Sequence, residues 1–305
     1  MTSHNVSLSS LHTGVSLGQF TCSPSPDTPH HVVYIAETSF VLYDTQTKVL
    51  LASYSSSPPT HFTVIVWKDD GIYTGDVNGT VLKWALKMSM YSSEEIGTLH
   101  MKCFHLSVSK NKQYSIVSAM ALDGTIIVYK CPLEETSWNI VQEMKGQMGI
   151  LSTTCDGQWM VRGDLLGEMT LFQWKPCNDN DGLYHWKMEY KWKRHKTSIA
   201  SLSWSFYEKK EDHFIWRLCS GDQNGTIMIW SIDDMEITSG VLEMKIDERF
   251  TLRKEHVLKE HSDAVTSVFK TTFATLVSVS MDGTICIWSL LNNKWKVNKR
   301  LGKWG

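Results

Sequence analysis

The chain has 305 residues, of which 42% are hydrophobic and 20% are charged, and this ordinary composition allows a large buried core. Its formal net charge of −2 excludes a strong overall field that would attract nucleic acid or an anionic membrane. No apolar run is long enough to span a bilayer, and the first residues lack the basic and apolar pattern of a secretory signal. We therefore expect a protein of the cytoplasm, and also of the nucleus, without membrane contact.

The first 30 residues are rich in Ser, Thr and Pro, and only Gly14–Gly18 has the character of a weak strand. A repeated unit follows, which consists of a strand, a tight turn and a strand rich in β-branched and aromatic residues. The clearest copy runs from Leu218 to Ser231 and turns at Asn224-Gly225, a dipeptide that tolerates the positive φ of a two-residue hairpin. The residue after the turn glycine, or its equivalent, falls at Ser39, Thr80, Thr125, Glu168, Thr226 and Thr284.

The intervals between these positions are 41, 45, 43, 58 and 58 residues. A period of about 40–45 residues with a terminal Trp is the sequence sign of a β-propeller. We therefore predict an all-β propeller with six recognisable blades, its seventh blade absent or incomplete, in a single domain over residues 1–305. The predicted blades cover residues 31–54, 61–86, 103–141, 150–193, 197–232 and 257–300, with an insertion at 233–256.

The last predicted blade carries four residues at characteristic positions. His261 precedes the first strand, Ser278 lies in the second, Asp282 lies in the turn and Trp288 ends the third. This pattern resembles the WD40 repeat, and the resemblance implies that the four side chains form a hydrogen-bonded cluster inside the blade. The corresponding cluster expected in blade five is His195, Ser220, Asn224 and Trp230.

A Ser-His-Asp set also suggests a hydrolase. However, the sequence contains no Gly-x-Ser-x-Gly elbow, and a catalytic triad would not recur in step with the blades, whereas a structural cluster would. The seven cysteines form no C-x-x-C pair, and no P-loop, dinucleotide fingerprint or paired-carboxylate motif is present. We therefore expect no catalytic residue, metal, cofactor or small-molecule substrate.

Residues 185–196 alternate between apolar and charged side chains, which predicts a half-exposed outer strand of blade four. Its cations can protect a sheet edge, or they can form a strip that binds a partner or makes a weak contact with tRNA. Both interpretations stay open. The residues of this basic strip are Lys187, Lys191, Lys193, Arg194 and Lys196.

Three segments extend the resemblance to one WD40 family. Val241–Glu248 precedes a leucine-containing lead into the His261 repeat, Leu290–Gly302 ends in Arg-Leu-Gly, and Ser39–Asp44 forms an early hairpin strand. This arrangement is similar to the first propeller of the Elongator complex subunit 2 family. The resemblance implies a non-catalytic scaffold whose partners are the large scaffold subunit and the catalytic subunit of Elongator, an assembly that modifies wobble uridines in tRNA.

The chain also departs from that family. The family has two propellers and closes the first with a seventh blade, whereas only 17 residues follow Trp288 here. We therefore expect a fragment or a short form that lacks the seventh blade, and the alternative is a ring of six blades that closes through the N-terminal strand. Two other functions are retained: a WD40 substrate adaptor of a ubiquitin ligase, and an RNA-binding propeller.

Overall fold

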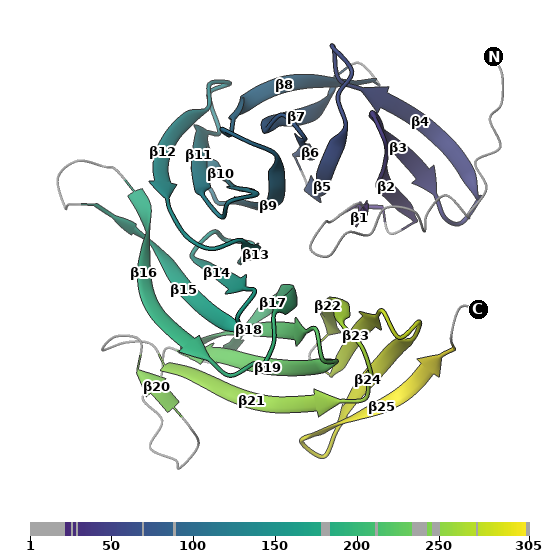
Figure 1. Cartoon of the computed structure of the whole chain (residues 1–305), viewed down its shortest axis with the longest axis vertical. Helices are drawn as coiled ribbons and strands as arrows, with labels where there is room; N and C mark the ends of the chain where they lie inside the picture. Colours follow the sequence, from purple (N-terminus) through teal and green to yellow (C-terminus); the bar gives the residue numbers. More distant parts are fainter. Residues whose placement is uncertain are drawn as a thin grey trace. The chain divides into compact units, whose positions relative to one another are not determined.

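The computed structural model describes residues 22–302, apart from 26, 29, 69, 88–89, 178–183, 211–212, 234–242, 246–250 and 273. The weak strand predicted at Gly14–Gly18 lies outside the described residues. All regular secondary structure in the described residues is β-strand, and it forms six antiparallel sheets (Figure 1). The fold is a six-bladed β-propeller, as predicted. The chain divides into two compact units, Met1–Leu106 and Ser107–Gly305.

In the first three blades, strands that follow one another in sequence pair side by side. Blade one contains β1 (Cys22–Pro24), β2 (His31–Ala36), β3 (Ser39–Asp44) and β4 (Val49–Ser55). Blade two contains β5 (Phe62–Lys68), β6 (Gly71–Asp76), β7 (Thr80–Lys87) and β8 (Met90–Thr98). Blade three contains β9 (Cys103–Lys110), β10 (Tyr114–Ala121), β11 (Ile126–Pro132) and β12 (Asn139–Met144).

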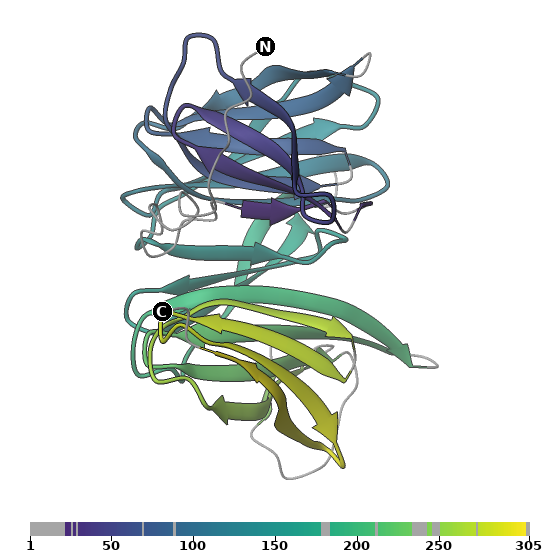
Figure 2. The same ribbon diagram turned by 90° about the vertical axis from the view of Figure 1, so that its right-hand side faces the viewer.

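The last three blades follow the same order, except that blade five has a fifth strand. Blade four contains β13 (Gly149–Thr153), β14 (Trp159–Asp164), β15 (Glu168–Pro176) and β16 (Tyr184–Lys193). Blade five contains β17 (Ile199–Lys210), β18 (His213–Asp222), β19 (Thr226–Asp233), β21 (Thr251–Lys259) and β20 (Glu243–Lys245). Blade six contains β22 (Val265–Thr272), β23 (Thr275–Ser280), β24 (Ile285–Leu291) and β25 (Lys294–Leu301), drawn side by side at the yellow end of the colour scale in both views (Figures 1 and 2).

Two outer strands lie beyond the predicted blade limits. Blade two continues to Thr98 through β8, and blade five ends with β21, which begins inside the predicted insertion. β21 pairs with β19 from Thr226 opposite Lys259 to Asp233 opposite Thr251. The insertion therefore lengthens the connection between the third and outer strands of blade five without replacing the outer strand. Blade six consequently begins at Val265, later than the predicted residue 257.

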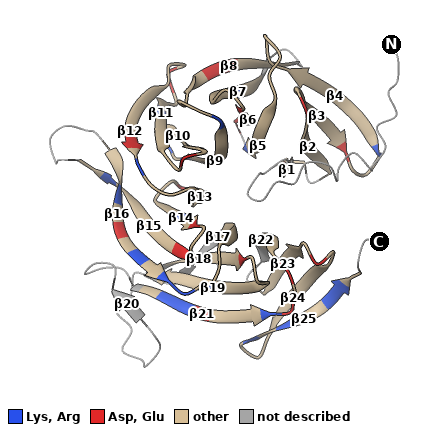
Figure 3. Ribbon diagram, viewed as in Figure 1, with Lys and Arg blue, Asp and Glu red and all other residues tan. Residues whose placement is uncertain are grey.

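The strands differ in burial because inner strands are covered on both faces, whereas outer strands are covered on one. All eight residues of β10 are buried. In β16, Trp186 and Trp192 are buried and the lysines between them are exposed, as the alternation predicts. Lys and Arg accordingly lie on the outer strands β16, β21 and β25 (Figure 3).

Tryptophans fill the core between blades four and five. The rings of Trp192 and Trp230 meet edge to face at 5.6 Å, and those of Trp159 and Trp216 at 6.2 Å. Such pairs contribute about 0.5–1.5 kcal/mol each beyond their buried area. The high tryptophan content of the sequence therefore serves packing between neighbouring sheets.

A buried histidine in β9 makes the stability depend on pH. Burial lowers the pKa of His105 from its ordinary value of 6.5 to about 3. Below pH 6.5 the unfolded chain binds a proton that the folded chain excludes. The free energy of unfolding should therefore fall, as pH decreases toward 3, by up to about 1.4 kcal/mol per pH unit. Urea unfolding between pH 7 and pH 4 measures this slope.

The variant His105→Gln should have a shallower slope in the same pH range, because it lacks the titrating ring. His100→Gln is the matched control, since His100 is exposed in the same part of the chain. Equal slopes in the wild type and in His105→Gln would contradict the assignment to His105.

Candidate functional site

Blade five contains a chain of hydrogen bonds that joins three of its segments. The indole Nε1 of Trp230 donates to Ser220 Oγ at 2.9 Å. Ser220 Oγ lies 2.7 Å from His195 Nε2, and His195 Nδ1 lies 2.8 Å from Asp222 Oδ2. Because the indole can only donate and the carboxylate can only accept, Trp230 Nε1 donates to Ser220 Oγ and His195 Nδ1 donates to Asp222 Oδ2.

Blade six repeats the arrangement. Trp288 Nε1 donates to Ser278 Oγ at 2.9 Å, and Ser278 Oγ lies 2.7 Å from His261 Nε2. His261 Nδ1 lies 3.1 Å from Asp282 Oδ2. The hydroxyl and amide of Thr284 and the amide of Ser262 donate to the same carboxylate, and these hydrogen bonds help to hold the pKa of Asp282 below its ordinary value against the opposing effect of desolvation. The structure thus brings together the four residues named in each blade from the sequence, with one exception.

The exception is Asn224, whose expected place in the blade-five cluster is taken by Asp222. Asn224 is exposed, and only its backbone amide contacts the cluster, by donating to Asp222 Oδ1 at 3.0 Å. Asp222 Oδ1 also accepts from the amide of Thr226 at 2.8 Å, just as Asp282 Oδ1 accepts from the amide of Thr284 at 2.9 Å. Asp222 lies three residues before its turn glycine and Asp282 lies directly before its own. Both carboxylates nevertheless accept from the equivalent amide, that of the residue after the glycine.

The same substitution of position occurs in blade two. Asp76 is buried, and its Oδ1 accepts from the amides of Asn78 and Thr80 at 2.9 and 2.8 Å. Trp84 Nε1 in that blade donates to Thr74 Oγ1 at 2.9 Å. Blade two thus keeps the carboxylate and the indole hydrogen bond.

Blade three completes its cluster with a residue from blade four. Its third strand carries Tyr129 in the tryptophan position, and the indole that donates to Ser118 Oγ, at 3.2 Å, belongs to Trp186 of β16. The side chain of Gln142 in β12 fixes this tryptophan, because its Oε1 accepts from Trp186 N at 2.7 Å and its Nε2 donates to Trp186 O at 3.0 Å. Blade three thus has no tryptophan at this position of its own third strand, and Trp186 of blade four supplies the indole instead.

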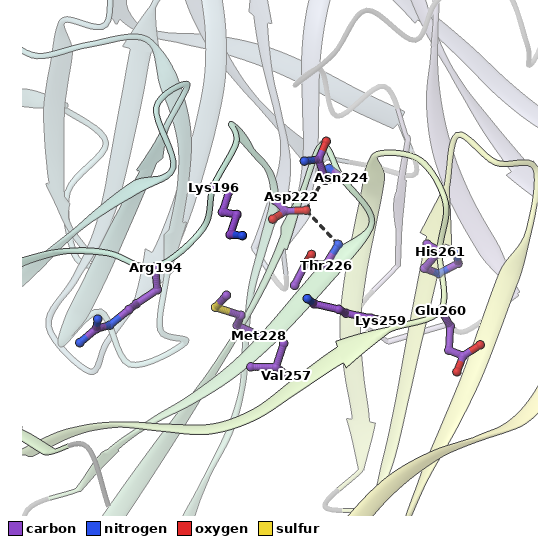
Figure 4. A pocket seen from close by; sticks show the side chains of 10 residues that line it. All are labelled: Arg194, Lys196, Asp222, Asn224, Thr226, Met228, Val257, Lys259, Glu260 and His261. Atoms are coloured by element: carbon purple, nitrogen blue, oxygen red, sulfur yellow. Dashed lines mark hydrogen bonds between the residues drawn. The ribbon is translucent and has the colours of Figure 1, made fainter.

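A pocket of about 470 Å³ opens at the turn end of blade five. Met228 belongs to the core cluster shared with blade four, so the pocket lies on the side of blade five that faces blade four. Cross-strand pairing places Thr226 next to Lys259 and Met228 next to Val257 on that side. The connection from β16 to β17 completes the wall. The lining residues are Arg194, Lys196, Asp222, Asn224, Thr226, Met228, Val257, Lys259, Glu260 and His261 (Figure 4).

The charged side chains of the pocket are oriented unequally. Lys196 and Lys259 extend into the pocket from opposite sides, whereas Arg194 is directed outward at its rim and Glu260 points away (Figure 4). Asp222 faces the pocket, but its oxygens already accept hydrogen bonds from His195, Asn224 and Thr226. The accessible charge of the pocket is therefore positive.

Two segments of the chain match a known protein family. Residues 186–231 and 252–289 match the family described as WD domain, G-beta repeat. These two segments are WD40 repeats. They include the whole of the blade-five cluster and the whole of the blade-six cluster. The WD40 repeats therefore occupy the part of the chain that carries the pocket.

Most of the chain shares its fold with chains of solved structures. One match is a chain of the "Crystal Structure of Mitotic Checkpoint Complex", with a TM-score of 0.67 and 12% sequence identity over 94% of this chain and 78% of that chain. At this identity the likeness shows the fold alone. A total of 1260 chains of solved structures match, so the fold does not select a function. A search among curated proteins gave no match.

The WD40 clusters are closed to substrates. Ser220 and Ser278 have no exposed surface, and each hydroxyl is engaged by an indole and an imidazole. A hydroxyl in this state cannot attack a substrate carbonyl. Among the described residues, no group of His, Cys, Asp and Glu could hold a metal ion, and no helix is long and apolar enough to cross a membrane.

The structure divides the basic strip predicted from the sequence. Lys187, Lys191 and Lys193 are exposed along β16, and Lys191 pairs with Glu168 at 3.5 Å. Arg194 and Lys196 follow the strand and line the pocket of the WD40 repeats. The strip is therefore two features, a charged sheet edge and one side of a pocket.

Lys259 was missed from the sequence because it was placed in the lead into blade six. Its position in the pocket depends on pairing with Thr226 at the far end of β19. The available signal was the alternation of residues 251–259, in which Leu252 and Leu258 are buried and Val257 and Lys259 are exposed. An outer strand read at that point would have placed Lys259 beside the turn.

Proposed function

We propose that the chain is a non-catalytic scaffold that binds other proteins through the turn-bearing ends of its blades. The observation that carries this proposal is the contrast between the two kinds of polar residue in the WD40 repeats. The clusters with serine, histidine and aspartate are buried and hold strands together, whereas the pocket of about 470 Å³ has positive side chains at its mouth. A volume in this range suits a side chain or a short segment of a ligand.

Exposed apolar turns support the same proposal. The turn residues between the second and third strands are usually polar, yet Leu122 is 44% exposed in blade three and Met281 is 54% exposed in blade six. Leu165 and Leu166 are 49% and 56% exposed in the turn of blade four. Neighbouring exposed apolar groups, such as Leu165 and Leu166 in one turn, are typical of a surface that a protein partner covers.

The finer proposal is a subunit of an Elongator-type assembly that supports modification of wobble uridines in tRNA, in the cytoplasm and the nucleus. The sequence resemblance supports it, as does the short strand β20, which lies within the insertion that precedes the His261 repeat. In this proposal the large scaffold and catalytic subunits are the partners, and this chain contributes organisation to the assembly.

Affinity purification of the tagged chain from its native cell, followed by mass spectrometry, tests both levels. Recovery of Elongator subunits, together with loss of wobble-uridine modification after depletion, is the result expected from the finer proposal. Recovery of a cullin-linked ligase would replace it with the adaptor function. Recovery of no specific protein, with the tagged chain folded, would contradict the scaffold function itself. Fluorescence of the tagged chain would check its localisation.

A further inference from the structure

The pocket of blade five has two ammonium groups without counter-ions. Some cations in blades four to six are paired, such as Lys175 with Glu189 at 3.0 Å and Arg217 with Glu255 at 3.2 Å. Within the described part of the chain, no carboxylate oxygen lies within 4.0 Å of the ammonium of Lys196 or Lys259. Two like charges that face one space without a partner repel each other, and a bound anion would relieve this repulsion.

We propose that this pocket binds a phosphorylated serine or threonine of a protein partner, an inference that rests on the scaffold function proposed above. The phosphate lies between Lys196 and Lys259, and Arg194 contributes from the rim. The hydroxyl of Thr226 and the side-chain amide of Asn224, both on the pocket wall, are further donors for its oxygens. Met228 and Val257 supply an apolar floor for the carbon atoms next to the phosphate.

Charge favours a phosphate over a carboxylate. A phosphorylated side chain carries about −1.5 to −2 charges near pH 7, which matches two ammonium groups, whereas a carboxylate would leave one of them unpaired. Charge-assisted hydrogen bonds to phosphate are also stronger than neutral ones.

The turn of blade four extends the surface next to the pocket. A Cβ atom on Gly167 would lie 2.6 Å from Thr197 O and 2.7 Å from His195 O, so this turn lies directly against the connection that carries Lys196. Leu165 and Leu166 are exposed on the same turn. We therefore assign to the partner an apolar side chain near its phosphorylated residue, which packs on these leucines.

The pocket is poorly suited to RNA. Nonspecific binding of single strands relies on exposed aromatic rings on which bases stack. The nearest tryptophans, Trp192 and Trp230, are 5% and 0% exposed. Two lysines around one concave site also do not form a track along a phosphate backbone.

A binding experiment on the purified full chain tests the assignment. The probes are three peptide libraries with random flanking residues and a central phosphoserine, aspartate or serine, and a single-stranded RNA oligonucleotide. Fluorescence anisotropy should show binding of the phosphoserine library, with the aspartate and serine libraries at least about tenfold weaker. The selected flanking residues should be enriched in apolar side chains.

Variants locate the binding. Lys196→Ala and Lys259→Ala should each weaken phosphopeptide binding about tenfold, because each removes one charged hydrogen bond. Lys187→Ala and Lys193→Ala are matched controls, since both residues are exposed on β16 outside the pocket. Leu165→Ser should reduce the selection of apolar flanking residues without removing the preference for phosphate. Circular dichroism checks that each variant is folded.

Several results would overturn the assignment: no binding of the phosphoserine library, less than about threefold preference over serine, or equal affinities in the pocket and control variants. Tighter binding of RNA than of phosphopeptide, lost in Lys196→Ala, would assign the pocket to RNA. The scaffold function fails separately. If affinity purification recovers the same partners with the Lys196→Ala/Lys259→Ala double variant, the scaffold stands and the phosphate site is wrong.

Discussion

Replacing Asp222 by alanine is expected to lower the free energy of unfolding by about 3–5 kcal/mol, because it leaves several hydrogen-bond donors without their acceptor at a cost of about 1–3 kcal/mol each. The His195 ring has no exposed surface and would lose its only carboxylate contact, while the amides of Asn224 and Thr226 would lose their acceptor. These groups cannot all reach water, so their hydrogen bonds would not be replaced. Urea unfolding near pH 7 measures the loss.

Asn224→Ala is the matched control, two residues away in the same turn. Asn224 is exposed and does not have positive φ, so its replacement should change the stability by no more than about 0.5 kcal/mol. Equal losses of stability in the two variants, or a larger loss for Asn224→Ala, would contradict the role of Asp222. Asn224 would then be the cluster residue, as expected from the sequence alone. The pair of variants therefore separates two turn positions that a sequence pattern treats as equivalent.

The lowered pKa of Asp222 also predicts how the stability changes at acidic pH. Hydrogen bonds from His195 and Thr226 hold the pKa of Asp222 below its ordinary value despite desolvation. The stability that this carboxylate contributes is present above the unfolded pKa of about 3.9, and it is lost as pH falls through the lower folded value. The difference between wild type and Asp222→Ala should accordingly shrink below about pH 4.

Replacing Trp186 by alanine should cost a similar amount, about 3–5 kcal/mol, because it empties a large buried volume between blades three and four. The Trp186 ring is 1% exposed and meets Trp174 edge to face at 5.0 Å. Its loss would also remove the donor to Ser118 Oγ and loosen the Gln142 contact with the β16 backbone. Chemical denaturation followed by tryptophan fluorescence and circular dichroism measures the effect.

The variant Trp186→Phe separates the loss of the hydrogen bond to Ser118 from the loss of packing. The phenylalanine ring keeps most of the packing but cannot donate to Ser118, so a loss of about 1–3 kcal/mol is expected. Met188→Ala on the same strand is the control, because Met188 is 53% exposed. A loss in Trp186→Phe no greater than that of Met188→Ala would show that the hydrogen bond between blades contributes nothing.

Local sequence information was sufficient for the fold class and the number of blades. Turn glycines with positive φ, such as Gly225 at +79° and Gly283 at +78°, recur at a spacing that only a repeated hairpin explains. The residues of the blade-six cluster could be named because His261, Ser278, Asp282 and Trp288 all belong to one continuous repeat. In that blade the local pattern and the tertiary contacts agree.

Tertiary structure decided the features that depend on neighbouring strands and blades. Trp186 of blade four donates to Ser118 of blade three, and Lys259 reaches the pocket because β21 pairs with β19 across the insertion. Asp222 occupies the place in the cluster that the sequence pattern assigned to Asn224. A carboxylate at either turn position reaches the backbone amide that follows the turn glycine. The sequence by itself thus determined the repeated hairpins, since turn and strand preferences are local. The strands and side chains that each hairpin contacts depend on register and on packing between residues far apart in the sequence. Local preferences do not encode such register and packing.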